Sequence, residues 1–198
     1  MKKRIVCFGD SNTYGYDPRS VLGGRYPAEV RWTGRLDADP RWEILNCGEN
    51  GREIPHTQPQ FQALDRLLTR CGPVDGLVVM LGTNDRFQMY RPTAEAVAAR
   101  MEELLRRTLC HPALEGAGVL LVAPPAVEAG AFSRRLSDAY RALADRRHIS
   151  FADAAAWPLE MEFDGVHLSA AGHRVFAERM RDILEKWGQP VDHRAPGM

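Results

Sequence analysis

Short apolar runs alternate with longer amphipathic stretches along most of the chain, and this alternation limits the possible folds more than any other feature. Five runs have the length and composition of buried strands: Arg4–Phe8, Trp42–Asn46, Gly76–Leu81, Gly118–Ala123 and the less apolar Ile149–Phe151. Apolar residues recur at helical spacing in four other stretches: Pro59–Arg70, Thr93–Leu109, Ser133–Arg147 and Ser169–Trp187. Strands that alternate with helices predict an α/β fold, with a mostly parallel sheet covered by helices on both faces.

Length and charge narrow the class of protein further. The chain has 198 residues, of which 44% are hydrophobic, and this suits one globular domain with a sizeable core. We expect that domain to span residues 1–187 and a C-terminal tail to follow over residues 188–198. Lys plus Arg and Asp plus Glu both number 26, so the formal net charge of zero predicts no nucleic-acid partner and no anionic membrane surface. The apolar run after Met1–Arg4 is too short for a secretory signal or a membrane span, so we expect a cytoplasmic protein.

Cysteine and histidine spacing gives no sign of a bound metal. The four cysteines, Cys7, Cys47, Cys71 and Cys110, contain no Cys-x-x-Cys pair. This pattern favours small buried hydrophobic residues in a reducing compartment, with a disulfide or a reactive thiol as the alternative. The sequence has no zinc, calcium or phosphate-loop pattern, so we expect neither a metal nor a cofactor.

Ser11 follows the first expected strand within Gly9-Asp10-Ser11-Asn12, where glycine and aspartate indicate a sharp turn. Open α/β sheets bind their ligands at the ends of strands, so this serine is placed for chemistry. A serine hydroxyl is a poor nucleophile until an imidazole takes its proton, which His167 could do. Asp164, three residues earlier, could accept a hydrogen bond from Nδ1–H and fix the tautomer. Taken singly, these segments have plainer interpretations, namely a capping serine and a common Asp-x-x-His loop.

Two further segments could supply hydrogen-bond donors to a developing oxyanion. Asn84 follows the third and most apolar expected strand, and its amide could donate to such an oxygen. Gly51 follows the second strand and could offer a backbone N–H where a side chain would block approach. A helix cap at Asn84 and a plain turn at Gly51 are the alternatives. Together with Ser11 and the Asp164–His167 segment, these residues follow four different strand ends, and this joint placement indicates a hydrolase.

Other residues are candidates for the wall of a pocket. The segment Tyr14–Arg31 is rich in glycine, proline and charge and predicts a long loop, a kind of loop that is often functional. Pro125 follows the fourth expected strand, and we expect it to shape an acyl pocket, with loop stiffening as the alternative. We also expect Val166, which precedes the candidate base, to contact a substrate.

The segments around Ser11, Gly51, Asn84 and His167 resemble the SGNH (GDSL-type) hydrolase family, whose four marker residues are Ser, Gly, Asn and His. The resemblance covers nearly the whole chain, and the blocks follow in the family's order. It implies a flavodoxin-like three-layer α/β/α sandwich with a five-stranded, mostly parallel sheet. It also implies a catalytic triad of Ser11, His167 and Asp164, and an oxyanion hole formed by the Ser11 N–H, the Gly51 N–H and the Asn84 side chain.

A closer resemblance, to the bacterial arylesterase/acyltransferase branch, rests on four segments: Gly9–Tyr16, Val30–Gly34, Met80–Asp85 and Val122–Pro125. Members of this branch cleave short-chain esters, aryl acetates especially. Some transfer the acyl group to alcohols or hydrogen peroxide, and several are oligomers. The resemblance therefore implies a serine esterase for a small-molecule ester, with acyl transfer and a homo-oligomer as further features. Tyr14 and Tyr16 stand where the branch has aromatic residues, often Trp, and Asn12 stands where the family name has Leu, a change to which we attach no functional consequence.

Other activities stay open for the same residues. A carbohydrate O-acetyl deacetylase would use the same triad, and the polar and aromatic residues of Tyr14–Arg31 suit a sugar. A lysophospholipase or thioesterase-like acyl hydrolase is a further alternative. A non-catalytic binding protein would be expected to lack a marker residue, and none is missing. A flavin-binding electron carrier shares the sheet topology but has no need of Asp164 and His167.

Overall fold

A five-stranded sheet forms the centre of the computed structural model, which describes residues 1–127 and 130–187. The strands are β1 (Lys3–Gly9), β2 (Trp42–Gly48), β3 (Gly76–Met80), β4 (Gly118–Ala123) and β5 (Ser150–Asp153). They lie in the order β2-β1-β3-β4-β5, and every neighbouring pair is parallel. This is the flavodoxin-like order. All five expected strands are present, with bounds within two residues of the prediction.

Four long helices carry the predicted amphipathic stretches: α3 (Gln58–Cys71), α5 (Ala94–Thr108), α6 (Ala131–Arg147) and α7 (Ala170–Lys186). Side-chain hydroxyls cap two of them, since Thr93 accepts from the backbone N–H of Ala96 and Ser169 accepts from that of Gly172. Three shorter helices are α1 (Ser11–Tyr14), α2 (Trp32–Asp37) and α4 (Thr83–Gln88), and two 3₁₀ turns cover Pro112–Leu114 and Ala154–Ala156.

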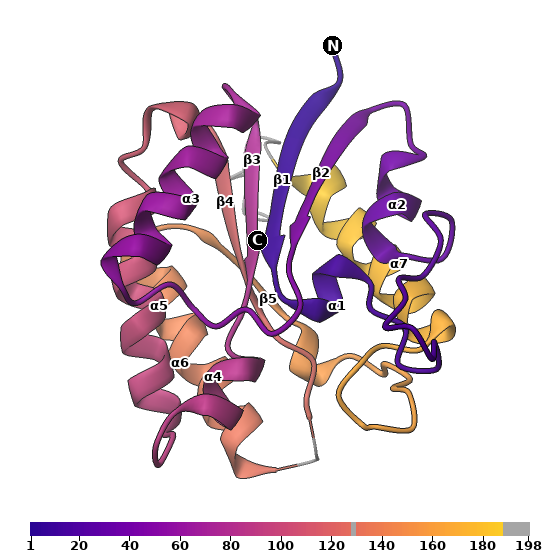
Figure 1. Ribbon diagram of the computed structural model, residues 1–198. Coiled ribbons are helices and arrows are strands. Elements are labelled where there is room, and N and C mark those ends of the chain that lie inside the picture. Colours follow the sequence, from indigo (N-terminus) through magenta and orange to yellow (C-terminus); the bar gives the residue numbers. More distant parts are fainter. Residues whose placement is uncertain (128–129, 188–198) are drawn as a thin grey trace, which may run out of the picture.

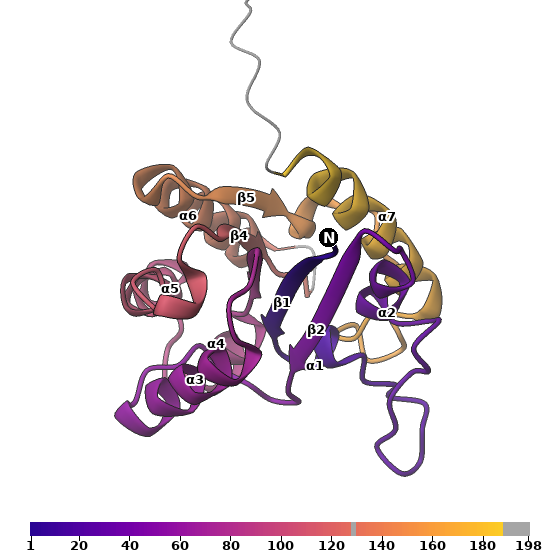
Figure 2. The ribbon, with the colours of Figure 1, turned by 90° about the horizontal axis from the view of Figure 1, so that it is seen from above.

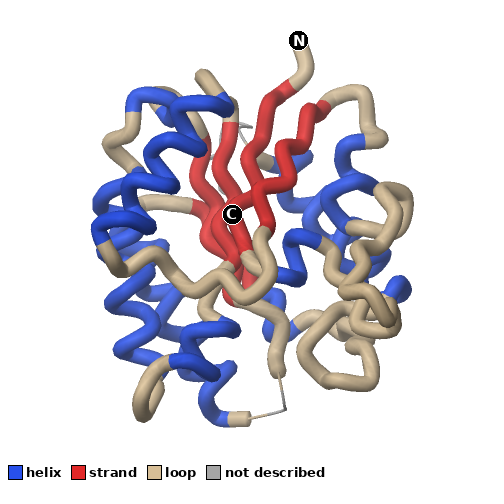
Figure 3. The backbone as a smooth tube through the Cα atoms, viewed as in Figure 1, coloured by secondary structure: helices blue, strands red, loops and turns tan. Residues whose placement is uncertain are grey.

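Helices cover both faces of the sheet, so the predicted three-layer α/β/α sandwich is confirmed (Figures 1 and 2). Side chains of α3, α5 and α6 pack with Leu77 and Val79 on one face. Side chains of α2 and α7 pack with Val78 and Met80 on the other face. Alternate residues of β3 therefore point to opposite layers, and the whole strand is buried. Figure 3 shows the strands enclosed between helices, with long loops gathered at one edge.

The predicted loop over Tyr14–Arg31 is largely irregular, as expected, with one isolated bridge between Tyr16 and Arg25. Its first residue, however, belongs to α1. The sequence did not predict α2 or α4. Each has only six residues, too few to show a helical repeat of apolar side chains.

The cysteines differ in burial, and only some of them match the prediction from the sequence. All four thiols are free, so no disulfide forms. Cys7 is buried, but Cys47 and Cys71 are half-buried and Cys110 is exposed, so the prediction of buried hydrophobic cysteines is wrong for Cys110. Within the described residues, no helix is both long and apolar enough to cross a bilayer. The predicted tail over residues 188–198 lies outside the described residues.

The carboxyl ends of the central strands lie level with one another. Gly9, the last residue of β1, pairs with Gly48 of β2 on one side and with Met80 of β3 on the other. Because the strands are parallel, the segments that follow them all begin at this edge of the sheet (lower edge in Figure 1). The parts of the chain that carry Ser11 and Asn84 therefore start side by side.

Close packing at Gly172 generates a prediction about stability. A Cβ atom at Gly172 would lie 2.1 Å from the carbonyl oxygen of Glu160, a backbone atom in the segment that leads to the candidate base. Replacing glycine by alanine in a helix usually stabilises it by up to about 1 kcal/mol. We expect Gly172→Ala instead to lower the free energy of unfolding by about 1–3 kcal/mol, measured by urea denaturation, because the helix and this segment must separate. Ala170→Gly, at the exposed neighbouring position, reports helix preference without a clash. A gain in stability for Gly172→Ala would contradict the close approach.

Candidate active site

Ser11 opens the four-residue helix α1 directly after β1. Asp10 caps this helix, since its Oδ1 accepts a hydrogen bond from the backbone N–H of Asn12 at 3.0 Å. The chain leaves the helix through Gly15, whose φ of +87° lies in the left-handed region that glycine adopts readily. Ser11 is only 7% exposed, so the turn holds a nearly buried serine at the carboxyl edge of the sheet.

Two glycines allow α1 to rest directly on the strand ends. A Cβ on Gly9 would lie 2.1 Å from Oγ1 of Thr13, and a Cβ on Gly48 would lie 2.1 Å from the backbone nitrogen of Tyr14. Side chains at either position would push α1 away from the sheet. These glycines therefore help to fix the height of Ser11 above the strands.

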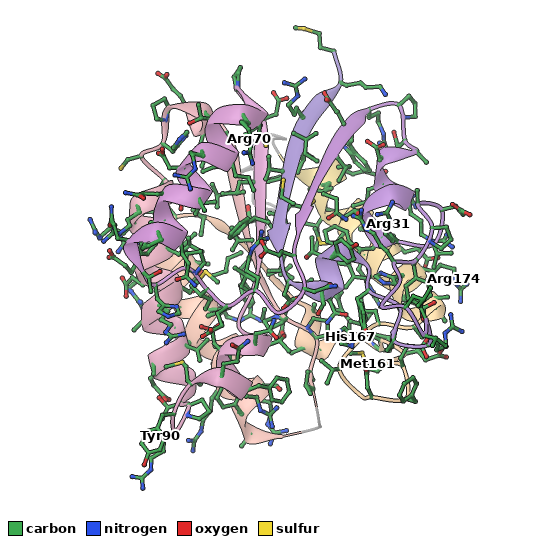
Figure 4. All side chains as sticks on the ribbon, in the orientation of Figure 1. Arg31, Arg70, Tyr90, Met161, His167 and Arg174 are labelled. Atoms are coloured by element: carbon green, nitrogen blue, oxygen red, sulfur yellow. The ribbon has the colours of Figure 1, made fainter. Side chains whose placement is uncertain are left out.

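The structure brings Ser11, His167 and Asp164 together from opposite ends of the chain. Nε2 of His167 lies 2.9 Å from Oγ of Ser11, and Nδ1 lies 2.6 Å from Oδ2 of Asp164. In Figure 4, His167 lies in the lower half of the molecule, far from Arg70 at the C-terminal end of α3. One imidazole thus bridges a hydroxyl and a carboxylate, an arrangement in which it can take the serine proton.

The Asp164 carboxylate is held in its charged form. Its Oδ1 accepts the backbone N–H groups of Val166 at 2.9 Å and His167 at 3.0 Å. Burial acts to raise the pKa of Asp164, but the hydrogen bonds from the His167 ring and from these two N–H groups outweigh it and lower the pKa below its usual value. An ionised carboxylate at Nδ1 keeps that nitrogen protonated and leaves Nε2 as the acceptor.

Asn84 and Gly51 lie in segments that are tied to each other and to the end of β1. Nδ2 of Asn84 donates to the carbonyl oxygen of Arg52 at 3.0 Å. The backbone N–H of Glu49 and the guanidinium of Arg52 donate to the carbonyl oxygen of Gly9, at 3.1 Å and 2.7 Å. Gly51 is exposed, has a φ of +73° and has open space where a Cβ would be. An amide nitrogen carries two hydrogens, so Asn84 can donate to a ligand as well.

The two predicted wall tyrosines are both half-buried at this edge. The ring of Tyr16 lies against His167, with 4.8 Å between ring centroids. The ring of Tyr14 is covered by the guanidinium of Arg25 at 4.3 Å. Tyr16 therefore contacts the candidate base directly, whereas Tyr14 packs against the long loop.

The other two predicted wall residues have different surroundings. Val166 is half-buried, and its carbonyl oxygen accepts a hydrogen bond from Asn12. Pro125 is buried and lines a narrow pocket with Thr83 and Arg86, beside α4. That pocket includes neither Ser11 nor His167 among its lining residues.

A buried carboxylate, Asp85 of α4, holds the loop after Gly51 against this helix. Its Oδ1 accepts from Arg100 at 2.9 Å and its Oδ2 accepts from the backbone N–H of Ile54 at 3.0 Å. Burial raises the pKa of Asp85, and these donors partly offset the rise. Across residues 1–127 and 130–187, no group of three His, Cys, Asp or Glu side chains is placed to hold a metal ion.

Sequence reasoning missed Asn12. Its Nδ2 donates to the carbonyl oxygen of Val166 at 3.0 Å, and its Oδ1 accepts from the backbone N–H of Leu168 at 2.9 Å. These contacts join residues more than 150 positions apart, so no local pattern could reveal them. The only available signal was the departure from Leu after the serine.

A model of the GDSL-like lipase/acylhydrolase family matches residues 7–175. The chain belongs to this family. No match was found among curated protein sequences.

Solved esterase structures share the fold. The carbohydrate acetylesterase Est24 from Sinorhizobium meliloti is 29% identical, with a TM-score of 0.81 over 93% of this chain and 99% of that chain. The inhibitor-bound aryl esterase of M. smegmatis is 27% identical, with a TM-score of 0.82 over the same shares. A member of the lipolytic G-D-S-L family from Veillonella parvula, 20% identical with a TM-score of 0.72 over 93% of this chain and 99% of that chain, shows the fold alone. This GDSL-family protein is a carboxylic ester hydrolase.

Burial of Asp10 generates a prediction about pH. Burial raises the pKa of this carboxyl to about 6, although the Asn12 N–H and the charges of His167 and Arg52 oppose the rise. Between pH 4 and pH 6 the unfolded chain releases a proton that the folded enzyme retains, so stability from this group is lost as pH rises. Asp10→Asn can still cap the helix but cannot ionise. We therefore expect its free energy of unfolding, relative to wild type, to rise by about 2–3 kcal/mol from pH 4 to pH 7 in urea titrations.

The control for this experiment is Asp138→Asn at an exposed position. It removes one negative charge without relieving a buried carboxyl. A difference between Asp10→Asn and wild type that stays constant with pH would show that Asp10 titrates in its ordinary range.

Proposed function

We propose that this GDSL hydrolase is a serine esterase that cleaves short-chain acyl esters, acetyl-type aryl or alkyl esters in particular, through an acyl-enzyme at Ser11. The observation that carries the proposal is the continuous hydrogen-bonded series from Ser11 Oγ through the His167 ring to Asp164, at 2.9 Å and 2.6 Å. A nucleophile within reach of a base, with the base oriented by a third group, is the arrangement that covalent catalysis requires.

The reaction proceeds by double displacement. His167 Nε2 takes the proton of Ser11 as Oγ attacks the ester carbonyl carbon, which gives a tetrahedral oxyanion. The intermediate collapses, and His167 gives its proton to the leaving alcohol while the acyl group stays on Ser11. His167 then deprotonates a water as it attacks the acyl-enzyme, and the imidazolium returns that proton to Ser11 Oγ as the acid leaves. An alcohol in place of water would give acyl transfer. Asp164 stays ionised and stabilises the imidazolium that forms in each half-reaction.

Three donors stabilise the oxyanion in this mechanism: the backbone N–H of Ser11, the backbone N–H of Gly51 and the side-chain amide of Asn84. The links from Asn84 to Arg52, and from Arg52 to Gly9, support this role because they hold both donor segments beside the end of β1. A donor that is fixed before reaction needs no reorganisation as charge develops, and each is worth roughly 2.7–4 kcal/mol when removed.

The acyl and alcohol groups bind between the proposed wall residues. Tyr16 packs against the His167 ring, and Val166 directly precedes His167 in the chain. Tyr14 contributes an aromatic surface, and Pro125, in the loop after β4, is the proposed limit of the acyl pocket on the side of α4. The likeness to the M. smegmatis aryl esterase supports aryl alcohols as leaving groups.

A carbohydrate O-acetyl deacetylase with the same triad is the second candidate. Its support is the likeness to Est24, a carbohydrate acetylesterase, over 93% of this chain. A cytoplasmic location, a homo-oligomer and a single domain over residues 1–187 stay predictions from the sequence.

The experiment that tests the proposed function compares wild type with Ser11→Ala on p-nitrophenyl esters from acetate to decanoate. We expect the acetate to react fastest, rates to fall with chain length, and Ser11→Ala to lower kcat by at least about 10⁴-fold because no other nucleophile is activated. Rates that rise with chain length would indicate a lipase or thioesterase-like enzyme instead. Faster turnover of acetylated xylan fragments than of aryl acetates would favour the deacetylase. Undiminished turnover by Ser11→Ala would overturn the mechanism.

Asp164 provides a separate test. Asp164→Asn keeps the size of the side chain but can place an amide N–H donor at His167 Nδ1. Nδ1 must then accept this hydrogen bond, so His167 is held in the wrong tautomer. We expect kcat for p-nitrophenyl acetate to fall by about 10³–10⁴-fold, with thermal unfolding recorded in parallel. Glu162→Gln is the matched control in the same segment. It weakens the contact with Tyr26 but leaves the triad in place, so it should retain most of the activity. Equal losses for both variants would argue against the orienting role.

A further inference from the structure

Asn12 lies immediately after Ser11 and holds the backbone on both sides of His167. The residue is 3% exposed. Its Nδ2 donates to the carbonyl oxygen of Val166 at 3.0 Å, and the backbone N–H of Leu168 donates to its Oδ1 at 2.9 Å. A carboxamide that donates and accepts in this way imitates the edge of a neighbouring strand. We call this pair of hydrogen bonds the Asn12 clamp.

The Asn12 clamp is itself firmly anchored. The backbone N–H of Asn12 donates to Oδ1 of Asp10 at 3.0 Å, and its carbonyl oxygen accepts from the indole Nε1 of Trp32 at 3.0 Å. Trp32 is 1% exposed, and its ring packs against Phe176 of α7. The backbone and the side chain of Asn12 therefore both have partners in the core.

The clamp ties the segment that carries the base to α1. Asp164 accepts the N–H groups of Val166 and His167, and the carbonyl oxygen of His167 accepts from the N–H of Glu162 at 2.7 Å. Those bonds are internal to the segment and can persist if it moves as a body. Two further groups of the segment, the Val166 carbonyl and the Leu168 N–H, bond instead to Asn12, which belongs to the same short helix as Ser11.

We propose that Asn12 is a positioning residue that sets the distance between Ser11 Oγ and His167 Nε2. The proposal rests on the proposed function, in which these two atoms exchange a proton. Because Ser11 and Asn12 are consecutive in α1, the nucleophile and the clamp move together, and the base is fixed relative to both. Proton transfer depends steeply on this distance, and a displacement of about 1 Å can lower a rate by about 100-fold.

The chemistry of asparagine explains why this residue type suits the position. One end of the side chain must donate to a carbonyl oxygen, and the other end must accept from an N–H. Aspartate would offer only acceptors and would face the Val166 carbonyl with negative charge. Leucine has the same branching but no polar atoms, and its methyl groups need about 3.5 Å or more from the groups that now lie at 2.9 and 3.0 Å. Either replacement would displace the segment that carries His167.

The test compares Asn12→Ala with Ser169→Ala on p-nitrophenyl acetate. Ser169 is a matched control because it is 6% exposed and its Oγ also makes two hydrogen bonds, with the Gly172 N–H and with Glu160. We expect Asn12→Ala to lower kcat by between about 10-fold and 100-fold with little change in KM, and Ser169→Ala to lose similar stability but little kcat. The second readout is the rate at which an organofluorophosphate modifies Ser11, which needs the same base and should fall in parallel.

If Asn12→Ala does not fold, Asn12→Asp tests the proposal in its place. Aspartate preserves the volume of the side chain and the acceptor for the Leu168 N–H. We expect it too to lose kcat at least about 10-fold. The proposal is overturned if a folded Asn12 variant keeps both kcat and the organofluorophosphate rate within about threefold of wild type. It is also overturned if Ser169→Ala loses kcat as strongly as Asn12→Ala. Ser11→Ala separates the two hypotheses, because its full activity would contradict the proposed mechanism, whereas its inactivity with normal Asn12 variants would contradict positioning alone.

Discussion

Parallel pairing of the strands determines where the candidate active site of this enzyme can lie. A parallel strand can be reached only by a crossover, so helices cover both faces and the carboxyl ends of all strands share one edge. The register places Gly9, Gly48 and Met80 at the same height on that edge. Three segments of the candidate site leave the sheet there, and the segment with His167 follows the edge strand β5, which is separated from β1 by β3 and β4.

Contacts between distant parts of the chain position the segment that carries His167. The candidate base lies before α7, and α7 approaches the preceding chain so closely that Gly172 has no room for a Cβ. The indole of Trp32 then connects α2 with α1, and Tyr16 covers the imidazole. Several contacts therefore together determine where the imidazole lies relative to Ser11. Proton transfer is sensitive to small changes in that distance, so it depends on all of these contacts.

The sequence predicted the elements whose signals are local. Apolar runs such as Gly118–Ala123 identified the strands because both faces of a parallel sheet are buried. The marker residues followed from turns at strand ends and from a family resemblance. What could not be predicted depends on distant partners: six-residue α2 is stabilised by Trp32 and Leu36 in the core, and Asn12 meets Val166 across 154 positions. Pro125 stays a prediction: it is buried beside α4, in a pocket whose lining includes neither Ser11 nor His167.

The clamp at Asn12 contacts only backbone atoms of the segment that it holds. Side chains in that segment, including the exposed Phe163 and the half-buried Val166, therefore take no part in it. Phe163 and Val166 can be exchanged without loss of these two hydrogen bonds, because every residue other than proline offers the same carbonyl and N–H groups. Substrate preference and the geometry of proton transfer can therefore change independently. Side chains of this loop can be replaced to suit other esters while the backbone that carries His167 keeps its position.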